Sequence, residues 1–143
     1  MAAAVVEITH VKEFSAAHRL TSAHLSEREN RELYGPCYRD HGHNYVVEVT
    51  VRGRVDARTG MVMDLNRLSV LMDERLIQKV DHLHLNHDVP FLAGTITTAE
   101  NVAIAFWREL EPALRAFKGC KLHRIRLHES RANLVDYYGP SRA

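Results

Sequence analysis

Apolar and polar side chains alternate along two segments near the start of the chain, residues 5–18 and 44–54. Alternation with a period of two is typical of a strand that buries one face and exposes the other. After a turn, the apolar residues 61–63 are expected to complete a hairpin with the second of these strands. The same alternation predicts a strand over residues 121–130 and a shorter one over residues 134–138.

Helical periodicity marks two segments in the second half of the chain. Behind Asp64, a favourable N-cap, apolar side chains recur at helical spacing over residues 65–80. A second helix is predicted from a capping box at residues 97–100 to Leu114, and Pro112 is expected to kink or split it. The pattern predicts an α+β protein in which both helices pack on one face of an antiparallel sheet.

Composition narrows the class of protein. A chain of 143 residues, 45% hydrophobic and 26% charged, suits one folded domain, which we take as residues 1–143. The net charge is +1 and no basic stripe stands out, so neither nucleic acid nor a membrane is an expected partner. The longest apolar run, Ala2 to Val6, is far shorter than the ~20 residues of a membrane span. With only Cys37 and Cys120 there is no disulfide framework, so we expect a cytoplasmic protein.

Ten histidines are unusual for this length, and three of them have the spacing of a metal site. His41 and His43 are two residues apart at the start of a strand, so their rings lie on one face. His18 ends the first strand, and antiparallel pairing would bring its ring to the other two. Three neutral imidazoles leave one tetrahedral position open, as in catalytic zinc sites. The alternative is a chance His-x-His with His18 hydrogen-bonded elsewhere.

Two further features indicate proton transfer. Cys37 precedes His41 by four residues, and a thiol near a metal and imidazoles loses its proton readily and can act as a base or nucleophile. An inert, buried cysteine is the alternative. Asp81 and His82 are adjacent, so the carboxylate can fix the tautomer of the imidazole. A histidine at a helix C-terminus is also favoured by the helix dipole alone.

Glu129 is the last residue on one face of the strand predicted over residues 121–130, a face shared with His123, Ile125 and Leu127. A carboxylate in such a row needs a partner, and a guanidine-like edge of a ligand would bind it with two hydrogen bonds. The alternative is a neighbouring arginine: Arg124, Arg126 or Arg131. Thr98 and Glu100 are explained as helix-entry residues, with Glu100 as the acid of the capping box.

Taken together, these segments resemble the 6-pyruvoyltetrahydropterin synthase family, which includes the 6-carboxytetrahydropterin synthases of the queuosine pathway. The resemblance runs from about residue 5 to residue 139. Six blocks carry it in order: Phe14–Leu20, Cys37 with His41–Tyr45, Thr59–Asp64, Asp81–Asn86, Thr98–Ala103 and His128–Ser130.

The resemblance implies a tunnelling fold (T-fold): a four-stranded antiparallel sheet with two helices on one face, in a homohexamer built from two trimers with sites shared between subunits. It implies 7,8-dihydroneopterin triphosphate as the substrate, with elimination of triphosphate. By matching positions, the Zn²⁺ ligands are His18, His41 and His43, the catalytic residues are Cys37, Asp81 and His82, the pterin anchor is Glu129, and Thr98 and Glu100 lie beside the pterin.

The product stays open between 6-pyruvoyl- and 6-carboxytetrahydropterin. The short spacer Tyr38–Asp40 resembles the 6-carboxy branch, whereas the insert at residues 21–34 and the segments at 60–63 and 100–103 resemble the pyruvoyl enzymes of tetrahydrobiopterin biosynthesis. Two rival functions are a non-catalytic zinc-containing module that binds a pterin or purine, and a zinc hydrolase, which would need a carboxylate base beside the metal.

Overall fold

The computed structural model describes residues 4–141, so residues 2 and 3 of the opening apolar run lie outside the described range. The helical segments are α1 (Glu27–Tyr34), η1 (Gly35–Tyr38), α2 (Leu65–Met72), η2 (Asp73–Ile77), α3 (Gln78–Val80), η3 (Pro90–Leu92) and α4 (Ala99–Leu114). The strands are β1 (Val5–His18), β2 (His41–Arg54), β3 (Leu83–His84), β4 (Cys120–His128) and β5 (Leu134–Tyr137).

One twisted sheet organises these elements, with the strand order β3-β1-β2-β4-β5. β1 and β2 pair antiparallel along their whole length, from Val5 opposite Arg54 to His18 opposite His41. β4 and β5 continue the antiparallel arrangement, while the two-residue β3 runs parallel to β1. The predicted α+β class and T-fold architecture are confirmed, with β3 added to the four antiparallel strands.

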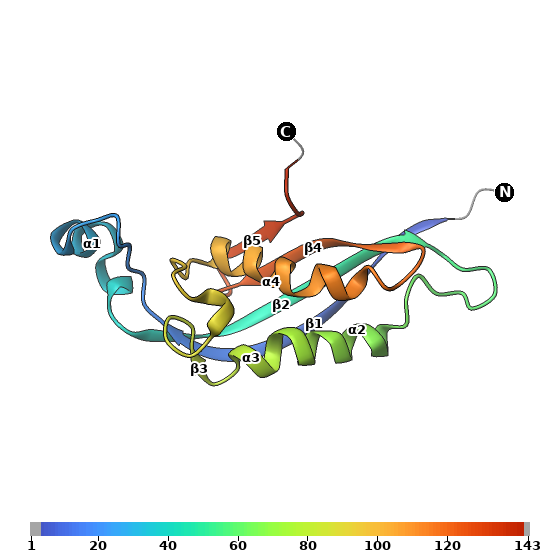
Figure 1. Ribbon diagram of the computed structural model, residues 1–143, viewed down its shortest axis with the longest axis horizontal. Coiled ribbons are helices and arrows are strands. Elements are labelled where there is room, and N and C mark those ends of the chain that lie inside the picture. Colours follow the sequence, from blue (N-terminus) through green and yellow to red (C-terminus); the bar gives the residue numbers. More distant parts are fainter. Residues whose placement is uncertain (1–3, 142–143) are drawn as a thin grey trace.

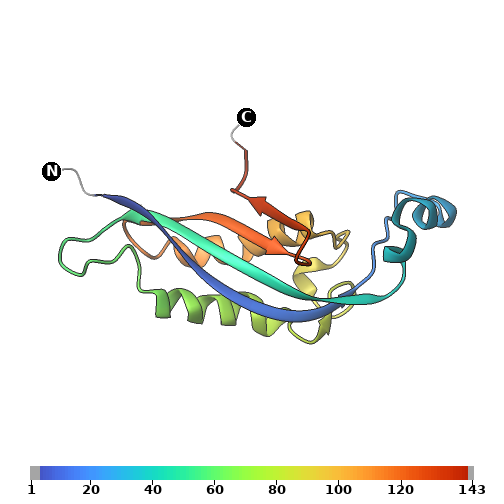
Figure 2. The same ribbon diagram turned by 180° about the vertical axis from the view of Figure 1, so that it is seen from behind.

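α2, α3 and α4 all cover the same face of the sheet, as Figures 1 and 2 show from opposite sides. On this face Tyr45, Val47, Val49 and Val51 of β2 are completely buried. Side chains of the two long helical segments pack on them, among them Leu68, Met72, Val102, Phe106 and Leu110. Burial of an aliphatic or aromatic side chain contributes roughly 1.5–3 kcal/mol, so this layer holds the sheet and helices together.

The expected hairpin strand at residues 61–63 is absent from the described chain, and that prediction was wrong. Both edges of β2 are already occupied, by β1 and by β4, so no third strand can pair there. The preceding loop instead closes on itself: the N–H of Asp56 donates to the carbonyl of Met61 at 3.0 Å.

Two other expectations need correction. α4 is not split and runs to Leu114, because only two residues of the helix follow Pro112 and no further turn remains to be separated. In β4 a register shift opposite Thr50 and Val51 leaves His123 without a partner on β2. His123 therefore does not share the buried face of Ile125, and its Nε2 lies 3.0 Å from Glu7.

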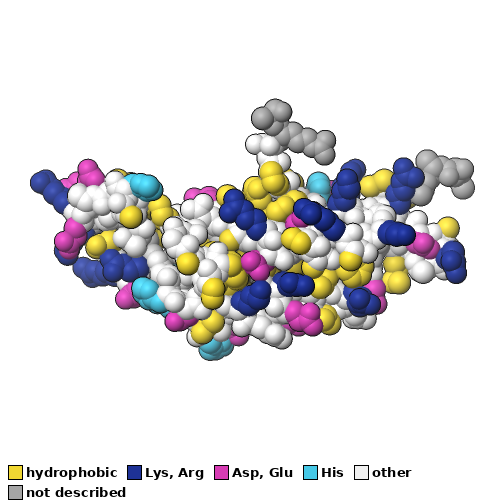
Figure 3. All heavy atoms as spheres, in the orientation of Figure 1, with side chains coloured by type: hydrophobic (Ala, Val, Ile, Leu, Met, Phe, Trp, Pro, Cys, Tyr) yellow, Lys and Arg dark blue, Asp and Glu magenta, His cyan; other side chains and the backbone are white. Residues whose placement is uncertain are grey.

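α1 was not predicted; it begins with a complete capping box between Ser26 and Glu29. Within residues 4–141, no helix combines the length and the apolar character that crossing a bilayer requires. On the helix-bearing side, Lys and Arg side chains are interspersed with Asp and Glu and form no continuous stripe (Figure 3).

Candidate functional site

His18, His41 and His43 meet where β1 ends and β2 begins. The register places His18 directly opposite His41 and Ala16 opposite His43, so all three rings emerge on the helix-covered face. One nitrogen from each ring lies within 4.8 Å of the others. The sequence prediction that these imidazoles converge therefore holds, because strand register brings together residues that are distant in the chain.

Backbone carbonyls fix how two of the rings are turned. His18 Nδ1 donates to the carbonyl of Thr97 at 2.8 Å, and His41 Nδ1 donates to the carbonyl of Arg39 at 2.7 Å. A histidine that binds a metal through Nε2 commonly has its other nitrogen held in this way. Thr97 was assigned only to a helix cap from the sequence, and no sequence signal indicated its contact with His18.

The remaining nitrogens fit a cation. Nε2 of His18 and Nε2 of His43 are buried and have no hydrogen-bond partner among the described residues. An unpartnered buried polar atom is costly, and three converging imidazole nitrogens are donors suited to a divalent transition metal. The His18, His41 and His43 cluster, called the triad below, therefore fits a metal site.

Electrostatics keep the triad ready to bind. Burial, with a smaller contribution from the neighbouring imidazoles, lowers the pKa of His18 to about 4, although the hydrogen bond that its ring donates to the carbonyl of Thr97 acts in the opposite direction. Burial also lowers the pKa of His43, against the attraction of Glu129. Since only a neutral imidazole binds a metal, both rings are in the binding form near neutral pH.

Glu129 lies beside the triad. Its Oε1 is 3.8 Å from Nε2 of His43, and its backbone N–H donates to the carbonyl of Asn133 at 3.0 Å. Arg124 and Arg126, two of the arginines weighed as its partners, form ion pairs with other carboxylates. Within residues 4–141 no arginine or lysine pairs with Glu129, and the neutral ring of His43 is only a 3.8 Å contact, so much of the hydrogen-bonding capacity of the carboxylate is free for a ligand.

Thr98 and Glu100 line one cavity with Glu129, a space of about 480 Å³ between the start of α4 and the turn after β4. The helix begins one residue later than expected: Thr98 is the N-cap and its hydroxyl accepts the N–H of Asn101 at 3.3 Å. The predicted capping box is therefore wrong. Glu100 is exposed and does not cap the helix.

Asp81 and His82 form a pair next to β3. Asp81 Oδ1 lies 3.0 Å from His82 Nδ1 and also accepts the N–H of Ser15 at 2.9 Å. The hydrogen bond from Ser15, with the one from His82, lowers the pKa of Asp81. His82 has a φ of 62°, an uncommon left-handed backbone for this residue type, and its side chain is 81% exposed. The ring thus faces outward.

Cys37 lies half-buried in η1, where its carbonyl accepts the N–H of Leu20 at 2.8 Å. Among the described residues, its sulfur makes no hydrogen bond to the triad or to the Asp81–His82 pair. The structure therefore joins the triad with Glu129, and Asp81 with His82, but it does not join Cys37 to either group.

Comparison with known proteins finds similar sequences and a similar structure. The model of the 6-pyruvoyl tetrahydropterin synthase family matches residues 7–140. The chain is 46% identical over 134 residues to the 6-pyruvoyl tetrahydrobiopterin synthase of Poecilia reticulata, covering 92% of this chain and 89% of that protein. It is 44% identical over 128 residues to the human protein of the same name, covering 88% and 86%. The structure of Caenorhabditis elegans 6-pyruvoyl tetrahydropterin synthase superposes with a TM-score of 0.88 at 38% identity, covering 98% and 100%.

Proposed function

The chain belongs to the 6-pyruvoyl tetrahydropterin synthase family, a family of lyases, and we propose that it converts 7,8-dihydroneopterin triphosphate to 6-pyruvoyltetrahydropterin with release of triphosphate. The observation that carries the proposal is the position of Glu129, 3.8 Å from a ring of the triad and without an arginine partner among the described residues. A carboxylate beside a metal site can fix a pterin ring and so set its side chain over the metal.

Glu129 would accept hydrogen bonds from the amino group and ring N–H of the pterin, a two-point contact that fixes orientation. Thr98 and Glu100 line the same cavity and would contact the bound ring. Orientation matters because holding reacting groups in place is itself a large part of a rate enhancement.

His18, His41 and His43 would hold Zn²⁺, and when bound this ion supplies Lewis-acid polarisation of the side-chain oxygens of the substrate. Cys37 would take the proton from the carbon next to the polarised oxygen. His82, oriented by Asp81, would carry protons on the other side of the substrate, and each such group is worth roughly 10²–10⁴ in rate.

The outward-facing His82 supports a site shared between copies of the chain, within the proposed homohexamer of two trimers. A shared site predicts complementation: Cys37→Ala and His82→Ala would each be inactive alone. Co-expressed in one oligomer, they would regain part of the activity, because some sites then hold one intact copy of each residue. Mixed oligomers as inactive as the single variants would contradict the shared site.

The direct test is to incubate the zinc form with 7,8-dihydroneopterin triphosphate and to analyse the products by mass spectrometry. Release of triphosphate without acetaldehyde is expected. Acetaldehyde would instead select the 6-carboxy branch, and substrate binding without turnover would indicate a pterin-binding module.

A further inference from the structure

A second cluster of metal-ligating side chains lies close to the triad. We propose that Asp40, His84 and His87 form a separate site for a divalent first-row transition metal ion. One ligand atom from each residue lies within 4.8 Å of the others. Asp40 Oδ1 is 3.0 Å from His84 Nε2, and the rings of His84 and His87 stack with their centroids 4.2 Å apart.

A tight turn after β3 holds two of these ligands side by side. The carbonyl of His84 accepts the N–H groups of His87 and Asp88, at 3.2 and 2.9 Å, and Asp88 Oδ2 accepts the N–H of His84 at 2.9 Å. The turn therefore brings the two imidazoles together on one side of the chain, where their rings stack. Asp40 reaches the cluster from the residue just before β2.

The second cluster lies on the opposite face of the sheet from the triad. His84 pairs with Ala17 of β1, whereas His18, the next residue of β1, points to the helix-covered face. The carboxylate of Asp40, 3.0 Å from His84 Nε2, lies with His84. The new site is therefore separated from the triad by the backbone of the sheet.

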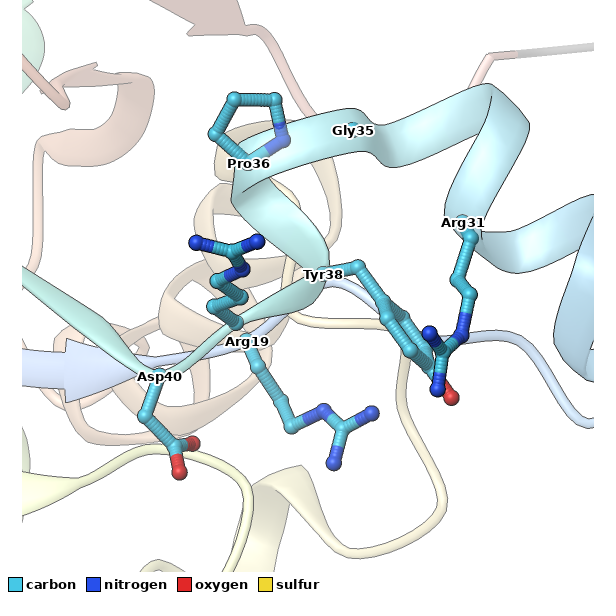
Figure 4. A pocket seen from close by; sticks show the side chains of 7 residues that line it. Arg19, Arg31, Gly35, Pro36, Tyr38 and Asp40 are labelled. Atoms are coloured by element: carbon cyan, nitrogen blue, oxygen red, sulfur yellow. The ribbon is translucent and has the colours of Figure 1, made fainter.

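The carboxylate of Asp40 has no arginine or lysine partner among the described residues, which favours a cation. Arg19, which lines the adjoining cavity with Asp40, stacks over the ring of Tyr38 at 4.3 Å and forms no ion pair with Asp40 in the described chain. Figure 4 shows the side chains of Asp40 and Arg19 extending from neighbouring strand ends. Asp40 Oδ1 and His84 Nε2 are joined by one hydrogen bond. A metal ion could replace the shared proton between these two atoms.

The donor set defines the class of ion. Two imidazoles and one carboxylate suit Zn²⁺, Co²⁺, Ni²⁺ or Fe²⁺, whereas Mg²⁺ and Ca²⁺ prefer oxygen ligands only. If a metal ion binds Nε2 of His84, the ring proton moves to Nδ1. Nδ1 then no longer accepts the N–H of Asn86, a long hydrogen bond of 3.2 Å. Asp40 and His87 are exposed and can move to close the site around the ion.

The test uses Co²⁺ as the probe, because its visible absorption reports the ligand set. In metal-stripped full-length protein carrying His41→Ala and His43→Ala, the triad is disabled, and one Co²⁺ per chain is expected to bind at the second cluster. Adding His87→Ala or Asp40→Asn should weaken that binding at least about 10-fold. His24→Ala, which changes an exposed histidine outside both clusters, should leave it unchanged.

No Co²⁺ binding in the triad-disabled protein would overturn the proposal, as would affinity that neither added substitution changes. Circular dichroism and thermal unfolding of each variant confirm that the fold is intact. The result is independent of catalysis, so a failure here leaves the proposed function standing, and an inactive enzyme would not affect this measurement.

Discussion

The two histidine clusters differ in what holds their rings. The triad is built on the paired ends of β1 and β2, His18 is completely buried, and backbone carbonyls orient His18 and His41. The second cluster is built on a turn, and its members Asp40 and His87 are exposed. The comparison teaches that strand register can pre-organise metal ligands before an ion arrives, whereas a turn brings them only near one another.

The largest effect is expected from removing a pre-organised ligand. His41→Ala leaves two imidazoles in the triad, and we expect at least about 100-fold weaker metal binding there together with loss of activity. The measurement is the ratio of zinc to protein after dialysis, in protein that also carries Asp40→Asn to disable the second cluster, with His24→Ala as the control. An unchanged ratio at the triad would refute the ligand assignment.

Acid should destabilise the metal-free protein through His18. Burial lowers the pKa of His18 to about 4 from an ordinary value near 6.5. Between these two pH values His18 is protonated in the unfolded chain but neutral in the folded chain. The contribution of neutral His18 is complete above about pH 6.5 and declines as the pH falls toward 4, by up to about 3 kcal/mol. Urea unfolding of the wild type and His18→Gln at pH 7 and pH 5 measures it; equal pH dependence in both would contradict the assignment.

A smaller effect is expected from the backbone that spaces the two rings of β2. A Cβ on Gly42 would lie 3.2 Å from the carbonyl oxygen of Ala16, so Gly42→Ala must push β2 from β1 by a few tenths of an ångström. We expect roughly 10-fold weaker binding at the triad, where a displaced strand misaligns two ligands at once. Metal titration decides this, and Gly60→Ala, which strains a turn with a φ of 73° outside the site, controls for a loss of stability alone.

The smallest effect is expected from the hydroxyl of Thr97. It lies 3.4 Å from His18 Nδ1, but the carbonyl of the same residue makes the shorter contact and stays in Thr97→Val. Metal affinity at the triad should fall by less than about 10-fold, with no change at the second cluster. A larger loss in titration would mean that the hydroxyl, rather than the carbonyl, orients the ring.

Local patterns predicted the long elements well. The alternation in β1 and β2 and the helical spacing of residues 65–80 reflect which side chains are buried, and burial is the same signal that stabilises the fold. The patterns failed where the outcome depended on pairing between strands. Residues 61–63 form no strand because both edges of β2 are already paired, and a register shift in β4 moves His123 off the buried face. β3 has two residues and no periodicity to detect.

The sequence by itself determined that His41 and His43 share a face, because alternation along a strand is local, and it placed Asp81 next to His82. Only the tertiary structure decided that His18 and Glu129 join His43, and that Glu100 is free of a cap because α4 starts at Ala99. Those contacts depend on strand register and on where a helix begins. Both are settled by packing among distant segments, which no single stretch of sequence contains.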